Sequence, residues 1–247
     1  AICDCDVDAA DLNLLLPPED MREEPFSGGT IPFIDAEKCT RCGRCVELCR
    51  FDALRADGGG VPEVMFTACE GCGLCEVACP AGAVNMQRVL TGKVCRADSE
   101  AGPIAWGELR TGAENSGKLV ARVRGAASAL AYEHGLPHLL TDGPPGAGCP
   151  VIASMGGARA TLVVTEPTLS GLPDLERVLE LAGHFGIPAM VCINKSDLDP
   201  SNRTAIENLA GEHDIPVIGR IPFDAEVHEI LREGGILARD GEGPAAR

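Results

Sequence analysis

Continuous apolar runs alternate with helically spaced apolar positions along the C-terminal half of the chain. Residues 161–165 and 189–193 are rich in apolar side chains, without the polar alternation of a strand that has one wet face. Between them, the apolar positions of residues 175–182 recur at the i, i+3, i+4 and i+7 spacing of a helix. Buried strands that alternate with helices predict an α/β fold, with a mostly parallel sheet covered by helices.

The same patterns predict the other elements of this half. A short helix begins at Pro150, a favoured first-turn residue, and another helix follows Asp224 as its cap. Further strands are expected over 107–110, 136–141 and 215–218, and further helices over 118–133 and about 202–212.

The N-terminal part of the chain has a different character. Residues 1–6 have the pattern of a buried strand, and a polar, proline-rich linker follows over 17–25. We therefore expect three regions: the start of the sheet domain and a linker over 1–30, an inserted α+β module over 31–92, and the remainder of the sheet domain over 93–247. Within the module, residues 31–35 and 83–87 are expected to form a short strand pair.

Eight of the 13 cysteines form two copies of one pattern, 30 residues apart. The copies are Cys39-x2-Cys42-x2-Cys45-x3-Cys49 and Cys69-x2-Cys72-x2-Cys75-x3-Cys79-Pro80. This is the ligand spacing of a ferredoxin with two 4Fe-4S clusters, in which the fourth cysteine of each run binds the other cluster. The expected ligand sets are Cys39, Cys42, Cys45 and Cys79 for cluster one, and Cys69, Cys72, Cys75 and Cys49 for cluster two.

The two runs differ after their fourth cysteine. Pro80 follows Cys79, but Arg50 follows Cys49, which changes the turn and places a cation near one cluster. Zinc is the main alternative, but zinc sites use two pairs of ligands instead of a run of four. Disulfides are disfavoured because cytosolic chains rarely keep them.

Composition restricts the class of protein further. Of 247 residues, 45% are apolar, which suffices for a core, and the net charge of −16 argues against nucleic acid and anionic membranes as partners. The chain contains no apolar run long enough to span a bilayer, and no secretory signal. Thiolate-bound clusters favour a cytoplasmic location.

Polar residues follow the predicted strands of the sheet domain. Asp6 ends the first strand, Asp142 follows the strand over 136–141, and Asn194 and Asp197 follow the strand over 189–193. In parallel sheets, ligands bind beyond the carboxyl ends of the strands. Carboxylates at two strand ends suit a Mg²⁺ ion and a polarised water, whereas Asn and Asp suit the edge of a purine.

The chain resembles the MinD and nitrogenase-iron-protein type of P-loop NTPases (SIMIBI type), specifically MinD-superfamily ATPases that carry an inserted ferredoxin domain. The strings that carry this resemblance are DCDVDAADLNLLL (4–16), GGTIPFIDAEKCTRCGRC (28–45), ENSGKLVARVR (114–124), TDGPPGAGCPVIAS (141–154), VVTEPTLSGLPDLERV (163–178) and INKSDL (193–198).

The resemblance implies roles for several of these residues. Asp6 would orient the attacking water, and Asp142 would reach Mg²⁺ through water. Gly146 would sense the γ-phosphate. Asn194 would contact the base, with Asp197 and the segment from Pro222 to Asp224 beside it.

The family's phosphate-binding loop is not found where the resemblance expects it. That loop would precede Ala1, so we expect this polypeptide alone to bind ATP poorly and not to hydrolyse it. The only Gly-x4-Gly-Lys string runs from Gly112 to Lys118 and continues with Leu119 in place of Ser or Thr. We interpret it as a decoy that starts the helix over 118–133, because no strong strand is predicted before it.

The other cysteines have a simpler interpretation. Cys3, Cys5, Cys95 and Cys192 are expected to be small core residues. Cys149 lies seven residues after Asp142, where the nitrogenase iron protein has a bridging-cluster ligand. Asn115 and Ser116 stand where the second such cysteine would be needed, so a third cluster is not expected.

These features predict an iron–sulfur nucleotide-binding protein that couples ATP binding and hydrolysis to electron transfer with a redox partner protein. A homodimer is expected in the nucleotide-bound state. Two alternatives remain open: a ferredoxin-type electron carrier without NTPase activity, and a cluster-assembly carrier. The nucleotide is also open, since Asn194-Lys195-Ser196-Asp197 has the N-K-x-D form that GTPases use, whereas the resemblance favours ATP.

Overall fold

The computed structural model describes residues 1–113 and 115–246. Its larger sheet has the strand order β2-β7-β8-β1-β9. Strands β1 (Ile2–Asp4), β8 (Ile104–Leu109) and β9 (Leu140–Asp142) are parallel, with β1 between the other two. The strand predicted over 136–141 is thus shorter and ends one residue later, whereas β8 begins three residues before the predicted strand over 107–110.

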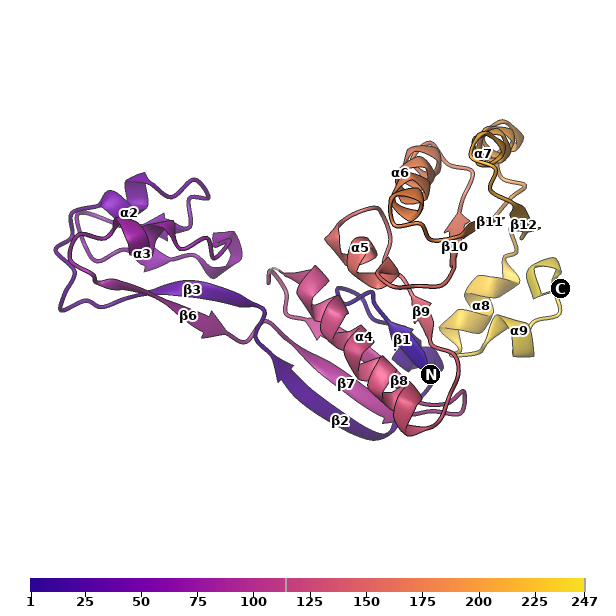
Figure 1. The fold of residues 1–247 in the computed structure, drawn as a ribbon, viewed down its shortest axis with the longest axis horizontal. Coiled ribbons are helices and arrows are strands. Elements are labelled where there is room, and N and C mark those ends of the chain that lie inside the picture. The colour runs from indigo at the N-terminus through magenta and orange to yellow at the C-terminus, as the bar shows by residue number, and fades with distance from the viewer. Residues whose placement is uncertain (114, 247) are drawn as a thin grey trace.

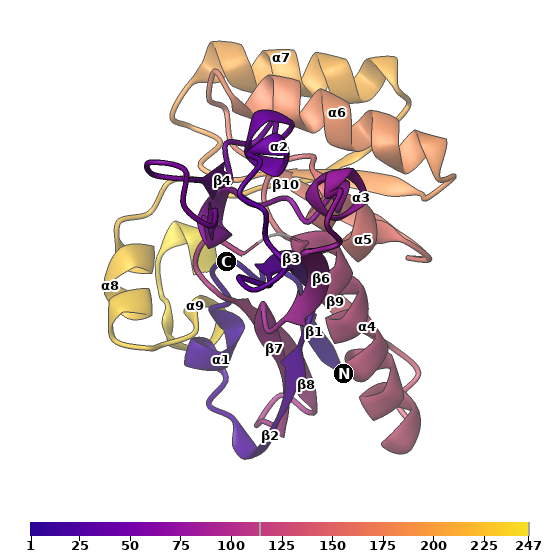
Figure 2. The same ribbon diagram turned by 90° about the vertical axis from the view of Figure 1, so that its left-hand side faces the viewer.

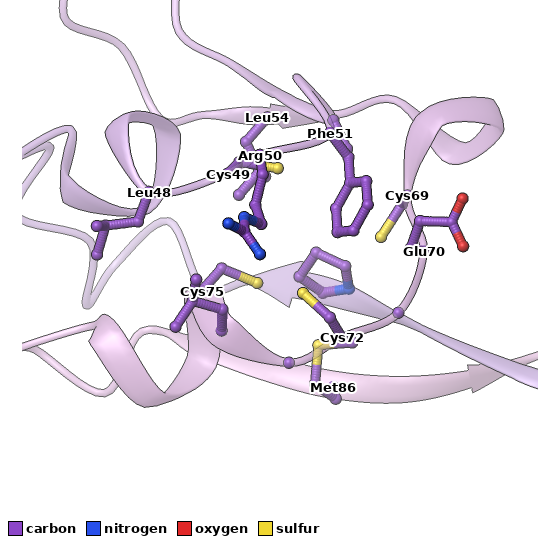
Figure 3. Close-up of a pocket in the computed structure, with 15 residues that line it drawn as sticks. Leu48, Cys49, Arg50, Phe51, Leu54, Cys69, Glu70, Cys72, Cys75 and Met86 are labelled. Atoms are coloured by element: carbon purple, nitrogen blue, oxygen red, sulfur yellow. The ribbon is translucent and has the colours of Figure 1, made fainter.

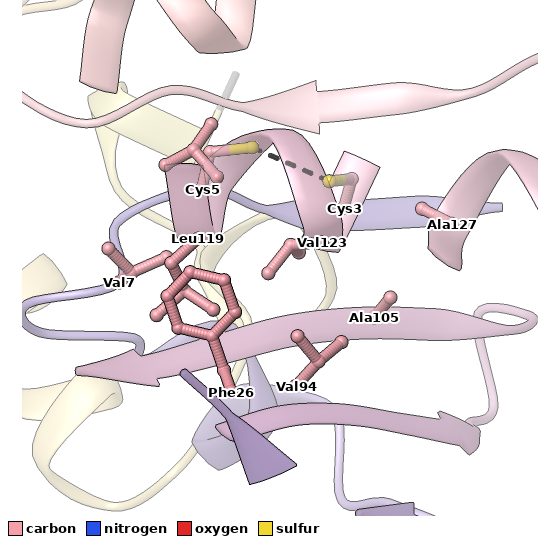
Figure 4. Close-up of a cluster of buried hydrophobic side chains, with 10 residues drawn as sticks. Cys3, Cys5, Val7, Phe26, Val94, Ala105, Leu119, Val123 and Ala127 are labelled. Carbon is pink, nitrogen blue, oxygen red and sulfur yellow. Dashed lines mark hydrogen bonds between the residues drawn. The ribbon is translucent and has the colours of Figure 1, made fainter. Parts of the chain in front are cut away.

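Helix α4 (Ser116–Glu133) covers one face of this sheet (Figure 1). Its buried residues Leu119, Val120 and Val123 contact a core that includes Cys3 and Cys5 (Figure 4). The Sγ atoms of Cys3 and Cys5 lie 3.4 Å apart, and this contact raises the pKa of Cys3. Cys3, Cys5, Cys95 and Cys192 are all buried, which confirms that they are core residues.

Strands β2 (Glu19–Phe26) and β7 (Gly92–Asp98) extend the sheet by antiparallel pairing. The predicted linker over 17–25 is therefore wrong for most of its length. The first seven residues of β2 are exposed, and only Phe26 is buried. An edge strand needs no apolar alternation when its backbone supplies the pairing, and Pro25 is tolerated there.

A second sheet contains the parallel strands β10 (Thr161–Thr165), β11 (Ala189–Ile193) and β12 (Val217–Arg220). Helices α6 (Gly171–His184) and α7 (Pro200–Glu212) cover one of its faces, around a core that includes Leu175 and Ile206. The opposite face carries Leu162, Val164 and Ile218, which remain 49–59% exposed. Among the described residues, the predicted covering of helices is therefore found on only one face of this sheet.

Short elements connect and close these sheets. Helix α5 (Cys149–Met155) precedes β10, and α1 (Leu12–Leu15) follows β1. Helices α8 (Glu226–Arg232) and α9 (Leu237–Asp240) and the 3-10 turn η2 (Pro244–Ala246) end the described chain. None of the described helices is both long and apolar enough to cross a membrane.

The cysteine module lies between β2 and β7 in sequence. Its base is the antiparallel pair β3 (Gly29–Ile34) and β6 (Val84–Val89). The short helices α2 (Arg44–Glu47) and α3 (Leu74–Ala78) lie next to each other above this pair (Figures 1 and 2). The strand pair β4 (Leu54–Arg55) and β5 (Glu63–Val64) and the turn η1 (Phe66–Ala68) complete the module.

Buried Thr91 holds the junction between module and sheet. Its backbone N–H donates to Phe26 O (2.9 Å), and its Oγ1 accepts from Gly28 N (2.9 Å). Its carbonyl accepts from Arg110 N (2.8 Å). The two segments that connect the module to the sheet are therefore hydrogen-bonded to each other. They are also hydrogen-bonded to Arg110, which follows β8.

Candidate cluster sites and nucleotide edge

A cavity that opens to solvent, with about 370 Å³ of empty space, lies between the two cysteine runs. All four expected ligands of cluster two line it: Cys49, Cys69, Cys72 and Cys75 (Figure 3). Pro32 and Met86 of the strand pair form part of its wall. Cys49 reaches this cavity from the other run, which is the crossed arrangement that the spacing predicts.

Backbone conformation brings the second run close to the strand pair. Gly71 has φ +66°, and a Cβ at this position would lie 2.6 Å from Thr30 O. Only glycine fits such a left-handed position against a backbone carbonyl. Burial raises the pKa of the Cys75 thiol, so a bound metal is needed to stabilise its thiolate.

The expected ligands of cluster one also lie near one another. Burial raises the pKa of Cys45, and the nearby charges of Cys39 and Cys79 raise it further. Cys79 Sγ accepts a hydrogen bond from Ala83 N (3.3 Å), and this bond lowers the pKa of Cys79. Cys42 is exposed at the surface of the module.

The donor set suits a 4Fe-4S cluster. Such a cluster takes four thiolates, and four cysteines line the one cavity between the two runs. The residues present therefore fit 4Fe-4S clusters.

Four carboxylates gather beyond the carboxyl ends of β1 and β9. Asp4 and Asp142 are register partners in adjacent parallel strands. Burial raises the pKa of Asp142, and the charges of Asp4, Asp11 and Asp6 raise it further. The structure thus brings Asp6 and Asp142 to one acidic edge, where a divalent cation would relieve the repulsion.

Asp4 organises this edge, although the sequence analysis gave it no role. Its side chain is fully buried and accepts backbone hydrogen bonds from Asp6 (3.0 Å), Asp11 (3.1 Å) and Leu12 (3.1 Å). Burial is the main cause that raises its pKa. The sequence signal was the position of this carboxylate inside an apolar strand, two residues before Asp6.

A second polar group lies beyond β10 and β11. Asn194 Nδ2 donates to Glu166 Oε1 (3.3 Å), and Lys195 Nζ pairs with the same oxygen (2.7 Å). Asp197 Oδ1 accepts from Phe223 N (2.6 Å), which fixes the segment after β12 beside Asn194. The structure therefore brings Asn194, Asp197 and the neighbours of Phe223 together, as expected for a base-binding edge.

Asp224 has a different partner set. Its Oδ1 accepts from Glu226 N (3.0 Å) at the start of α8, and its Oδ2 accepts from Ala245 N (3.2 Å). Pro222 is partly buried next to Phe223. Gly146 has φ +82° and open space around it, in the loop between β9 and α5. Among the described residues, no hydrogen bond or ion pair joins the acidic edge to the Asn194 group.

The Gly112–Lys118 segment differs from the sequence expectation. Strand β8 precedes it and α4 follows it. Since β8 is longer than the short strand predicted over 107–110 and is mostly buried, the lack of a strong strand no longer supports the decoy interpretation. Lys118 Nζ donates to Gly28 O (3.3 Å) at the module junction, and Leu119 is buried. The lysine therefore binds the module instead of an open phosphate site; Glu114 lies outside the described residues.

The same segment borders the second cysteine run. A cavity of about 310 Å³ is lined by Gly112, Ala113 and Asn115 on one side and by Cys69 and its neighbours on the other. A Cβ atom on Gly112 would lie 3.0 Å from Cγ2 of Thr67. Strand β8 leads into these residues, and it is the parallel neighbour of β1, which ends at the acidic edge. Gly112, Ala113 and Asn115 therefore link the acidic edge to the expected ligands of cluster two.

Comparison with known proteins identifies two components. A family model described as a 4Fe-4S dicluster domain matches residues 32–86. The uncharacterized protein MJ0578 of Methanocaldococcus jannaschii is 30% identical over 237 residues, which cover 92% of this chain and 75% of that protein. The chain belongs to the family of this protein.

The family's fold is also found among solved structures. The septum site-determining protein MinD from Pyrococcus horikoshii OT3, solved as a complex with Mg-ADP, matches with a TM-score of 0.52 at 16% identity, over 99% of this chain and 77% of that chain. The sheet domain therefore has an α/β fold of the MinD-like P-loop NTPase type, and a 4Fe-4S ferredoxin domain accompanies it. The predicted fold class is confirmed.

Proposed function

We propose that this protein carries electrons on two 4Fe-4S clusters and binds a Mg²⁺-nucleotide that controls their transfer to or from a redox partner protein. The observation that carries the proposal is the cavity walled by Cys49, Cys69, Cys72 and Cys75, since it joins both runs around one cluster. When bound, the clusters supply one-electron chemistry at potentials set by their surroundings. Cys39, Cys42, Cys45 and Cys79 would hold the other cluster.

The nucleotide would lie along the carboxyl ends of the parallel strands. Asp6 and Asp142 would hold Mg²⁺ and orient a water, and Asn194 with Asp197 would border the base. Asp197 already accepts a hydrogen bond from Phe223 N, so its role would be to hold the segment around Phe223 in place beside the base. This arrangement is supported by the MinD-like fold and by the raised pKa of Asp142 at the acidic edge.

The phosphate-binding strand and loop would occupy the space between β9 and β10. Neither strand pairs with another strand on that side within the described residues. Leu140, Leu162 and Val164 of these strands are 49–70% exposed, which is unusual for parallel strands. A further strand with its helix would bury these side chains and bring a glycine-rich turn to the edge.

Gly112, Ala113 and Asn115 support coupling between the two sites. They follow β8, beside the strand that ends at Asp4, and they line the cavity next to Cys69. A nucleotide-dependent shift of the acidic edge would move these residues and change the surroundings of cluster two. Among the described residues that line this cavity there is no expected ligand of cluster one, so the response of cluster one should be smaller.

Anaerobic redox titration of the full-length protein tests this proposal. Both clusters are followed by electron paramagnetic resonance without nucleotide, with Mg-ATP, and with Mg-GTP. We expect Mg-ATP to bind and to shift the midpoint potential of cluster two more than that of cluster one. Clusters that titrate identically with and without bound Mg-ATP would refute coupling, and absence of nucleotide binding would leave a ferredoxin-type carrier. Sedimentation in the same solutions tests the expected nucleotide-bound homodimer.

A further inference from the structure

The two cysteine runs carry opposite charge. Residues 38–50 contain four cations and one carboxylate, whereas the equivalent residues 68–80 contain two carboxylates and no cation. The cations are Lys38, Arg41, Arg44 and Arg50. In a chain with a net charge of −16, such a local excess of positive charge stands out from the acidic background.

Only two of these cations face solvent beside cluster one without a partner. Lys38 pairs with Asp35 (3.1 Å), and Arg50 lines the cavity of cluster two. Arg41 and Arg44 are exposed and flank Cys42, and within the described part of the chain their side chains make no ion pair or hydrogen bond. Their positive charge is therefore available to another molecule.

Arg41 also has an unusual backbone. Its φ is +58°, and the equivalent residue of the second run is Gly71, with φ +66°. Left-handed backbone is costly for a residue with a Cβ, so glycine is the favoured residue at this position. A long cation that occupies a glycine position against its own conformational preference indicates that its side chain is used.

Cluster one lies at the end of the module that points away from the sheets. Strand β3 begins at Gly29, next to Asn115, and runs outward to Ile34 (Figure 1). The first cysteine run follows that outer end, and Cys79 bonds to Ala83 just before β6 returns. Cluster two instead lies over Pro32 and Met86 and borders the sheet domain.

The second run also carries an exposed apolar side chain close in sequence to a ligand expected for cluster one. Val77 of α3, two residues before Cys79, is 85% exposed. Docking faces of proteins commonly combine an apolar centre with a charged rim, and complementary charge speeds encounter more than it strengthens binding.

We propose that Arg41 and Arg44 form the docking face of cluster one for an electron-carrier protein whose surface is acidic around its redox centre. This inference rests on the proposed function as a two-cluster electron carrier. Arg41 and Arg44 would hold the partner's centre near Cys39, Cys42, Cys45 and Cys79, and the cluster bound there would accept the one electron that the partner's centre gives up, with no bond or proton exchanged. Cluster two would then lie between cluster one and the nucleotide edge. Cluster one would therefore be the site at which electrons enter the protein.

The test variant copies the second run into the first. Arg41→Gly/Arg44→Leu installs the residues that stand at the equivalent positions, Gly71 and Leu74, so the loop keeps a backbone that the repeat already supports. The matched control is Arg55→Gln/Arg88→Gln, which removes two exposed cations of β4 and β6 in the same module. Iron content and circular dichroism establish that each variant is loaded and folded.

Electron transfer is measured by anaerobic stopped flow with two donors, a reduced plant-type 2Fe-2S ferredoxin as the acidic protein and the methyl viologen radical as a small cation. With the ferredoxin at low salt, we expect Arg41→Gly/Arg44→Leu to be roughly tenfold slower than wild type and less sensitive to salt. The control variant should stay within about twofold of wild type, because general charge loss has little effect on a local encounter.

Three outcomes would overturn the docking face. They are an unchanged ferredoxin rate, an equal slowing with methyl viologen, and a shift in the potential of cluster one that accounts for the slower rate. A wild-type protein that binds no clusters would instead overturn the proposed function together with this inference, and iron analysis separates that case.

Discussion

Replacement of Asp4 tests whether this buried carboxylate holds the acidic edge in place. The residue accepts three backbone hydrogen bonds, from Asp6, Asp11 and Leu12, and is fully buried. In Asp4→Ala, all three N–H groups lose their acceptor. Each unsatisfied donor costs about 1–3 kcal/mol, and water can reach part of the site, so we expect a loss of roughly 3–5 kcal/mol in the free energy of unfolding.

Asp4→Asn separates hydrogen bonding from charge. Its amide oxygen can keep the two bonds at Oδ2, from Asp11 and Leu12, while its NH2 group would face the N–H of Asp6. The expected loss is about 1–2 kcal/mol, because one bond is lost and the repulsion with Asp142 is relieved. The matched control is Asp8→Ala, an exposed carboxylate of the same loop, with an expected change within about 0.5 kcal/mol.

The single tryptophan reports on this site directly. Trp106 is 1% exposed and is the register partner of Asp4 in the adjacent parallel strand. Its fluorescence during anaerobic urea unfolding follows the sheet that contains Asp4. Asp4 does not hold the acidic edge in place if Asp4→Ala unfolds at the same urea concentration as Asp8→Ala, or if Asp4→Asn loses as much stability as Asp4→Ala.

The pH dependence has a defined sign. Burial raises the pKa of Asp4 in the folded state, so folding favours its protonated form. The wild type should therefore lose stability as pH rises from the ordinary Asp pKa through the raised one, whereas Asp4→Asn lacks this contribution. Comparison of the two proteins at matched pH values measures it, and parallel pH profiles would contradict it.

Three further predictions concern the module and the helix beside it. Cys49→Ser should lower the iron content from about eight to about four atoms per chain and perturb the cluster bound by the second run, and retention of that cluster's resonance signal would exclude the crossed ligand set. Arg50→Pro should lower the midpoint potential of cluster two by about 20–40 mV relative to cluster one, because an exposed cation near the cavity stabilises the reduced cluster by roughly 0.5–1 kcal/mol, and an equal shift at both clusters would contradict this. Gly71→Ala should destabilise the second run by about 2 kcal/mol or more since its Cβ would meet Thr30 O, whereas Gly125→Ala in α4 has open space and should stabilise the protein by about 0.5–1 kcal/mol; thermal unfolding compares the two.

The parallel strands and the cysteine runs were predictable because each carries its own local pattern. Strands β10 and β11 have the predicted bounds, since continuous apolar runs mark strands buried in parallel sheets. The spacing of the cysteines predicted that Cys49 crosses to the cavity of the second run. The 4Fe-4S dicluster match covers residues 32–86, which include all eight of those cysteines.

Features that depend on tertiary partners were missed. Strand β2 is polar and exposed, and only its pairing with β7 makes it a strand. The role of Asp4 required the loop 6–12 to fold back over its side chain. The bond from Lys118 to Gly28 joins residues 90 positions apart, which no local pattern reveals. The roles of Asp6, Asp142, Gly146 and Asn194 in nucleotide binding remain predictions.

The pairing of Phe26 with Gly92 has a consequence for the engineering of this protein. Everything between these neighbours leaves the sheet and returns to the same place, so a turn of a few residues could replace it and still close a β2–β7 hairpin. A whole 4Fe-4S ferredoxin domain could therefore be inserted into, or removed from, a MinD-like sheet at this point without any strand changing its neighbour. The same position is where another redox unit could be exchanged for this one.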